Sequence, residues 1–208
     1  MFNNHENVRV VELGAGVGLT SLVCSLFTKR IMCTDLENIV KLAENNYKTN
    51  KINCSEEILF KKIDWKNYEN ILNRSQSCSC SNYELDESDI AYIESSNVFL
   101  AADVVYDDEL TINFLNLLCR LMSCKTNQPK CAFIALEKRM NFEVTSLDVG
   151  SSCYDYFCES MKELNEYSNE GIQFKTEILD LETLPKYMIS YDRSEYLVIW
   201  KVTTTTTE

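Results

Sequence analysis

Three glycines alternate in the stretch VVELGAGVGLT, residues 10–20, which lies between two apolar runs. Gly14, Gly16 and Gly18 stand where a strand would pass into a helix, and glycine there permits a tight bend and a close approach to a ligand. The spacing is G-x-G-x-G, and Leu19 occupies the position at which a dinucleotide fingerprint has its third glycine. No lysine follows, which excludes a P-loop. The pattern therefore predicts a ligand that packs against the main chain.

Acidic residues end the next two expected strands. Asp35 ends the second strand, where a carboxylate can accept hydrogen bonds from both hydroxyls of a ribose. Asp64 can accept from an adenine amino group, and the neighbouring indole of Trp65 can cover the ring face. A helix cap for Asp35 and a core position for Trp65 are the structural alternatives. Together with the glycine loop, these residues favour an adenosine ligand.

Glu12 lies inside the first apolar strand, just before the glycines. A carboxylate at that position is costly unless it meets a cation or a hydrogen-bond donor. S-adenosylmethionine carries an ammonium group and a sulfonium, whereas the nearby pyrophosphate of NAD is an anion. Glu12 therefore favours S-adenosylmethionine and argues against a dehydrogenase.

A second pair of residues follows in AADVVYDD, at the end of the fourth expected strand. Asp103 and Tyr106, spaced D-x-x-Y, fall beside the expected cofactor. They could instead cap the following helix, although Asp107 or Asp108 is better placed to do so. An acid inside an otherwise apolar strand indicates a functional role.

These residues need a sheet that brings strand ends together. Strand-like segments occupy residues 8–14, 30–36, 57–65, 97–106, 131–139, 171–180 and 194–202. Helix-like segments occupy 18–29, with Leu22, Val23, Leu26 and Phe27 on one face, and 37–50, 107–124 and 151–168. The alternation predicts an α/β fold with a doubly wound, mostly parallel, seven-stranded Rossmann-like sheet. The last two strands have no helix between them, so the last strand should run antiparallel.

The chain should form one domain over residues 1–202. Residues 75–96 are rich in serine and acidic residues and contain no Lys or Arg, which predicts a disordered or loosely packed insertion. The threonine-rich end, residues 203–208, should be a flexible tail. No apolar run approaches the roughly 18 residues of a membrane span, so no membrane partner is expected.

Composition excludes several kinds of chemistry. The formal net charge of -12 disfavours nucleic acid as a partner and favours a basic protein segment. The single histidine, His5, argues against most Ser-His, Cys-His and His-metal sites. Ten cysteines are scattered without a C-x-x-C pair, which indicates a reducing, intracellular compartment and no metal site.

Several motifs together are similar to those of a known family. VELGAGVGLTSL, CTDL, DW, AADVVYDDELT and LEKRMNF resemble the seven-strand, S-adenosylmethionine-dependent protein-lysine methyltransferases of the methyltransferase-like group. The likeness runs from about Val8 to the final VIWKV. It implies a cofactor site made by Gly14, Ala15, Gly16, Asp35, Asp64, Trp65 and Ala102. The carboxylate inside the first strand adds Glu12 to this predicted site. It also implies that Asp103 and Tyr106 shape a lysine pocket.

The resemblance implies methyl transfer to a lysine of a nucleic-acid-binding protein in the nucleus, with chaperone contacts, and the net charge makes a basic protein the expected substrate. We also expect a monomer, located in the nucleus, the cytoplasm or both. At the end of the fifth strand, Glu137, Lys138 and Arg139 either touch substrate or are solvated. A methyltransferase for nucleic acid or small molecules is disfavoured by the charge, and by ADVVY in place of N-P-P-Y. Family members carry a longer segment before the first strand, with a tryptophan that contacts the cofactor, whereas seven residues precede it here. The alternative is therefore a non-catalytic, S-adenosylmethionine-binding interaction module.

Overall fold

The structure is a computed structural model. It describes residues 8–28, 30–50, 58–73, 81–124, 126, 128–143, 148–169, 171–188 and 190–206.

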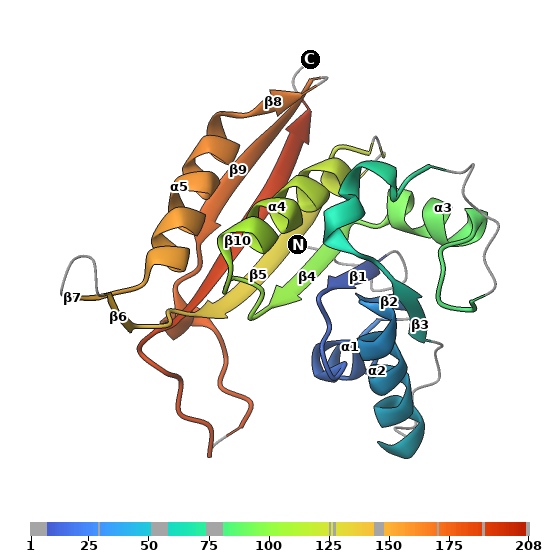
Figure 1. The fold of residues 1–208 in the computed structure, drawn as a ribbon, viewed down its shortest axis with the longest axis horizontal. Helices are drawn as coiled ribbons and strands as arrows, with labels where there is room; N and C mark the ends of the chain where they lie inside the picture. The colour runs from blue at the N-terminus through green and yellow to red at the C-terminus, as the bar shows by residue number, and fades with distance from the viewer. Residues whose placement is uncertain are drawn as a thin grey trace.

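An eight-stranded sheet forms the centre of the molecule, in the order β3-β2-β1-β4-β5-β10-β9-β8 (Figure 1). Its strands are β1 (Arg9–Leu13), β2 (Arg30–Asp35), β3 (Ile58–Lys62), β4 (Val98–Ala102), β5 (Cys131–Glu137), β8 (Ser168–Asn169), β9 (Ile172–Ile178) and β10 (Leu197–Thr206). Strands β1 to β5 pair in parallel, and β10 is antiparallel to both β5 and β9. The predicted sheet is therefore confirmed, with the two-residue strand β8 added at its edge. A separate hairpin joins β6 (Asn141–Glu143) to β7 (Asp148–Gly150).

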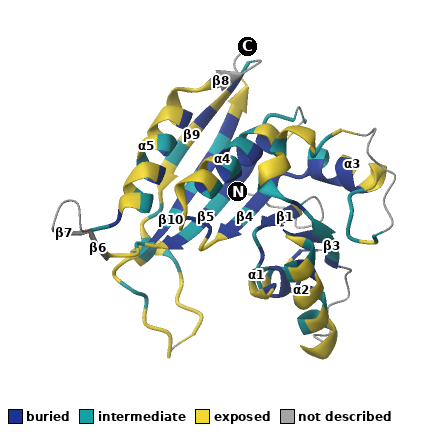
Figure 2. Ribbon diagram, in the orientation of Figure 1, coloured by how far each residue is buried: buried dark blue, intermediate teal, exposed yellow. Residues whose placement is uncertain are grey.

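Helices cover both faces of this sheet. They are α1 (Leu19–Cys24), α2 (Glu37–Asn50), α3 (Glu87–Ser95), α4 (Asp108–Met122), α5 (Ser152–Glu166) and the short 3-10 helices η2 (Trp65–Asn70) and η4 (Leu181–Thr183). Val10 of β1 packs in one apolar cluster with residues of α1 and α2, whereas the adjacent Val11 packs in another with residues of α4 and α5. Because successive strand residues point to opposite faces, the sheet is doubly wound. Figure 2 shows the buried central strands between helices whose outer faces are exposed.

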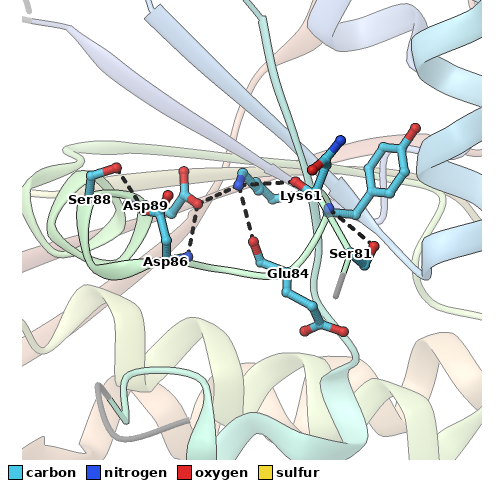
Figure 3. Close-up of polar contacts among 8 residues, drawn as sticks. Lys61, Ser81, Glu84, Asp86, Ser88 and Asp89 are labelled. Carbon is cyan, nitrogen blue, oxygen red and sulfur yellow. Dashed lines mark hydrogen bonds and ion pairs between the residues drawn. The ribbon is translucent and has the colours of Figure 1, made fainter. Parts of the chain in front are cut away.

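Helix α3 overturns the prediction of disorder over residues 75–96, as far as residues 81–96 are concerned. Asp86 and Asp89 form a reciprocal capping box at its start. Lys61 of β3 reaches the same acid, with 2.6 Å from its Nζ to Asp89 Oδ2, and the two side chains are only 14% and 5% exposed (Figure 3). Lys61 also donates to the carbonyl oxygen of Glu84 at 3.1 Å. Acidic residues that suggested a solvated segment thus cap helix α3, and one of them pairs with a lysine of strand β3. Residues 74–80 lie outside the described residues.

The prediction of a flexible tail is wrong for residues 203–206. Strand β10 continues to Thr206, which lies opposite Ile172 of β9. Threonine is β-branched and suits a strand, so a low-complexity run of threonines can extend a sheet. Residues 207 and 208 lie outside the described residues.

Helix α1 is shorter than expected and ends at Cys24. Leu22 is buried, but the predicted inward face is wrong for the other three residues, and Phe27 is 70% exposed. The Thr28 hydroxyl donates to the Val8 carbonyl oxygen at 3.0 Å, so the chain turns back to the sheet before a second helical turn can form.

Lys130 links two helices to the sheet at the edge opposite the carboxyl ends of the parallel strands. Its side chain is buried, and its Nζ donates to the carbonyl oxygens of Glu94 in α3, at 2.9 Å, and Leu121 in α4, at 2.8 Å. It therefore satisfies carbonyls that helix C-termini leave without partners. Burial lowers the pKa of Lys130 to about 8.

Candidate active site

The three glycines of the loop after β1 all have positive φ, at 72°, 54° and 83°. A Cβ on Gly14 would lie 2.7 Å from the six-membered ring of Trp65, and one on Gly18 would lie 3.0 Å from Cβ of Ala43 in α2. A Cβ on Gly16 would meet no atom within 4 Å. Gly14 and Gly18 are therefore needed for packing within the protein, and Gly16 leaves main chain facing open space.

Asp35, at the end of β2, lies beside this open part of the loop. Its Oδ2 accepts from the main-chain N–H of Gly16 at 2.9 Å, and its Oδ1 accepts from that of Leu36 at 2.7 Å. A carboxylate has about four acceptor positions, so each oxygen can accept once more. Asp35 thus fixes the loop and still offers acceptors to a ligand.

Glu12 has a hydrogen-bond partner within the protein that no local sequence pattern indicates. The side chain is 1% exposed, and the hydroxyl of Ser21 in α1 donates to its Oε2. Burial raises the pKa of Glu12 above its ordinary value of 4.5, although the bond from Ser21 opposes the shift. The donor that this carboxylate requires is therefore already supplied by the protein, one helical turn beyond the glycines.

Glu12→Gln is expected to make the folded protein more stable at pH 7. Because the folded-state pKa is raised, ionisation of Glu12 removes stability as the pH rises from 4.5 through the folded-state pKa. Glutamine keeps the acceptor for Ser21 without the charge. Urea unfolding from pH 5 to 8 should show the advantage of Glu12→Gln growing with pH and then levelling.

Glu37→Gln is the matched control, because Lys41 lowers the pKa of this partly exposed carboxyl. That variant should gain no stability with rising pH. A Glu12→Gln protein less stable than the parent at pH 7 would contradict the account of Glu12.

Asp64 and Trp65 lie where β3 passes into η2. The Asp64 side chain accepts from the main-chain N–H of Lys66 at 3.0 Å and so caps η2. Trp65 is partly buried, and its ring centroid lies 5.3 Å from that of Phe114 in α4. Trp65 thus takes the predicted core alternative while also forming the surface against which the glycine loop rests.

The D-x-x-Y pair follows a strand that ends earlier than predicted, at Ala102 rather than residue 106. Ala102 is exposed at that end. Asp103 has φ 56°, which makes it the one non-glycine residue with positive φ in the described parts of the chain. Val104 and Val105 insert into the core, whereas Asp103 and Tyr106 on either side are exposed. The two buried valines therefore hold the side chains of Asp103 and Tyr106 at the surface.

Arg139, two residues beyond β5, contacts both members of this pair. Its Nη2 lies 2.7 Å from Oδ2 of Asp103, and its Cζ lies 5.8 Å from the ring centroid of Tyr106. Burial, followed by the negative charge of Asp35, raises the pKa of Tyr106. The phenol is therefore neutral at neutral pH. The sequence placed Arg139 at a strand end but gave no sign of its partners.

Parallel pairing explains how these residues meet. The carboxyl ends of adjacent parallel strands lie at one edge, where an open α/β sheet binds its ligands. Strands β3, β2, β1 and β4 are neighbours in that order, so all ten predicted site residues belong to this edge or the loops that leave it (Figure 1). Of these residues, Glu12 and Ala15 are buried.

Cavities do not by themselves indicate this site. A cavity of about 530 Å³ between α4 and α5 includes none of the predicted residues. A cavity of about 280 Å³ beside η2 includes Asp64. Among the described residues, no group of three or more His, Cys, Asp or Glu side chains is arranged to hold a metal ion, and no helix is suited to cross a bilayer.

The groups at this edge fit an adenosine ligand with a cationic end. The loop at Gly16, where an added Cβ would meet no atom within 4 Å, and the carboxylates of Asp35 and Asp64 follow the neighbouring strands β1, β2 and β3. Residues 1–149 match the model that describes the lysine methyltransferase family. The chain belongs to the lysine methyltransferase family. The resemblance and the S-adenosylmethionine cofactor predicted from the sequence are thereby confirmed at the level of the family.

Curated relatives extend the match. The chain is 30% identical to methyltransferase-like protein 22 of Mus musculus over 202 residues, which cover 95% of this chain and 49% of that protein. It is 33% identical over 119 residues to protein-lysine methyltransferase METTL21E of Mus musculus, covering 55% and 42%. The chain thus spans about half the length of the curated relatives it matches.

Solved structures share the fold of this chain. The methyltransferase domain of bacterial CtHen1-CN superposes with a TM-score of 0.54 at 14% identity, over 97% of this chain and 91% of that one. Magnesium protoporphyrin IX methyltransferase from Synechocystis PCC 6803, with bound SAH, gives 0.51 at 13% identity, over 96% and 75%. These likenesses concern the fold alone.

Proposed function

We propose that this chain transfers a methyl group from S-adenosylmethionine to a lysine side chain of a basic protein. The main support for this proposal is one structural observation. The glycine loop and Asp35 lie at the same edge of the sheet as the exposed residues Asp103 and Tyr106. The chain's family supplies the reaction class.

Each cofactor residue has a proposed part. Main chain at Gly14, Ala15 and Gly16 would lie along the methionine portion, and Asp35 would accept from the ribose hydroxyls. Asp64 would accept from the adenine amino group, with Trp65 and Ala102 lining the site and Glu12 supplying negative charge behind the loop. When bound, S-adenosylmethionine supplies an electrophilic methyl group on a cationic sulfur.

The remaining groups act on the incoming lysine. Its amine must lose a proton to attack, and a free lysine has a pKa of about 10.4. Asp103 would first bind the ammonium and orient its side chain, while the neutral phenol of Tyr106 would form one side of the channel. Removal from water and a nearby cation both lower a lysine pKa, so the proton leaves to solvent as the site closes around the side chain. Alignment of the amine supplies much of the acceleration.

Charge at the edge supports a basic substrate. Asp107, Asp108 and Glu109 begin α4 directly after Tyr106, and all three are exposed. Together with the net charge of -12, they favour a target lysine within a basic segment and oppose direct binding of nucleic acid. A nucleic-acid-binding substrate, nuclear location and chaperone contacts stay predictions from the resemblance, and a monomeric state also stays a prediction.

The first test is calorimetric titration of the chain with S-adenosylhomocysteine. The parent should bind saturably, and Asp35→Ala should bind about 10- to 100-fold more weakly, because hydrogen bonds to a charged acceptor contribute about 1.5–3 kcal/mol. Glu37→Ala removes the same charge two residues away and should bind like the parent.

Absence of saturable binding to the folded parent would contradict the cofactor assignment. Binding without radiolabel transfer from S-adenosylmethionine to any protein of a fractionated cell extract would favour the non-catalytic alternative.

A further inference from the structure

Arg139 contacts Asp103 and Tyr106, the two groups to which a substrate lysine would bind. Its guanidinium forms the 2.7 Å ion pair with Asp103 and lies above the ring of Tyr106. A carboxylate beside an aromatic face is a combination that attracts an alkylammonium ion, through charge and through the ring quadrupole. The protein therefore presents its own cation at the place where the substrate's cation has to arrive.

We propose that Arg139 is a displaceable internal competitor, which sets the affinity and selectivity of the lysine site; this inference rests on the proposed function. The ammonium of the substrate replaces the guanidinium on Asp103, and the Arg139 side chain moves into solvent. A cation that offers only its charge competes poorly with a tethered guanidinium. A lysine that also gains contacts from its surrounding polypeptide can displace it.

The contact is weak enough to exchange. The side chains of Arg139 and Asp103 are 52% and 59% exposed, and exposed ion pairs contribute little because water and salt screen them.

A hydrogen bond fixes the backbone next to Arg139, whereas the side chain of Arg139 is exposed to solvent. The main-chain N–H of Lys138 donates to the Tyr196 carbonyl oxygen at 3.0 Å, and the Lys138 ammonium lies 4.8 Å from the ring centroid of Tyr154. Arg139 and the following Met140 are exposed. The guanidinium can therefore leave Asp103 by side-chain rotation, without movement of β5.

The test uses n-butylammonium chloride, which reproduces the end of a lysine side chain, added to protein saturated with S-adenosylhomocysteine at constant ionic strength. Binding is followed by NMR through the amide signals of Asp103 and Tyr106. Arg139→Gln should bind n-butylammonium about two- to fivefold more tightly than the parent, the range expected for removing an exposed competing ion pair. Lys138→Gln loses the same charge one residue away and should match the parent. In Asp103→Asn, the further change Arg139→Gln should give no gain.

Equal or weaker binding by Arg139→Gln would overturn the proposal, as would an equal gain in Lys138→Gln or no binding to any variant. Failure of the parent to bind S-adenosylhomocysteine in the same samples would instead indicate failure of the proposed function.

Discussion

Asp103→Asn should lower methyl transfer to a protein substrate by about 100- to 1000-fold, while S-adenosylhomocysteine binding stays close to that of the parent. Asparagine has the same shape and tolerates a positive φ, so the backbone at 56° is preserved. Only the charge that would hold the lysine ammonium is lost. The rate is measured as radiolabel transferred from S-adenosylmethionine to substrates in one fractionated extract.

Asp107→Asn is the matched control for Asp103→Asn. Asp107 caps α4 by accepting from the main-chain N–H of Leu110 at 2.8 Å, and asparagine caps helices about as well as aspartate. The control therefore removes one negative charge from the same surface and leaves the helix intact. Equal losses of activity in the two variants would show that surface charge, rather than a lysine contact at Asp103, supports the reaction.

Gly14→Ala and Gly16→Ala should separate stability from cofactor binding. Alanine at Gly14 would combine a left-handed backbone with a Cβ 2.7 Å from Trp65, which should cost about 2–5 kcal/mol of unfolding free energy. Alanine at Gly16 has the same backbone problem but no neighbour within 4 Å, so its cost should be about 1–2 kcal/mol.

Cofactor binding should be affected in the opposite order, more by Gly16→Ala than by Gly14→Ala. A methyl group at Gly16 would occupy the space that faces the cofactor. Gly16→Ala should weaken S-adenosylhomocysteine binding by on the order of tenfold or more, the loss expected when an overpacked contact costs about 1–3 kcal/mol. Urea unfolding and calorimetry of both variants check the two effects. Unchanged binding by a folded Gly16→Ala protein would mean that the cofactor does not approach this part of the loop.

The sequence was informative wherever a local pattern carried the signal. Alternating glycines, strand-ending acids and apolar runs gave the order of elements, and parallel pairing then brought Asp35, Asp64 and Asp103 to one edge. The same local patterns failed where the decisive partner lay elsewhere in the chain. Asp89 is ordered because Lys61 pairs with it, and Glu12 is tolerated because Ser21 donates to it.

Composition and periodicity also misjudged exposure. The run from Leu22 to Phe27 has a helical spacing, but α1 is only six residues long and ends at Cys24, before two full turns, so most of the apolar side chains in this run remain at the surface. The Arg139–Asp103 pair joins residues from two strand ends and depends on the adjacency of β4 and β5. No pattern within either segment could have indicated that contact.

The left-handed backbone at Asp103 restricts which amino acids can stand there. Glutamate carries the same charge and could in principle bind the same ammonium, yet φ near 56° is adopted mainly by glycine, asparagine and aspartate among residues without special strain. Of these, aspartate alone is an anion. Main-chain geometry and the proposed chemistry together therefore leave aspartate as the single suitable residue at this position. A conservative substitution here loses either the backbone conformation or the charge.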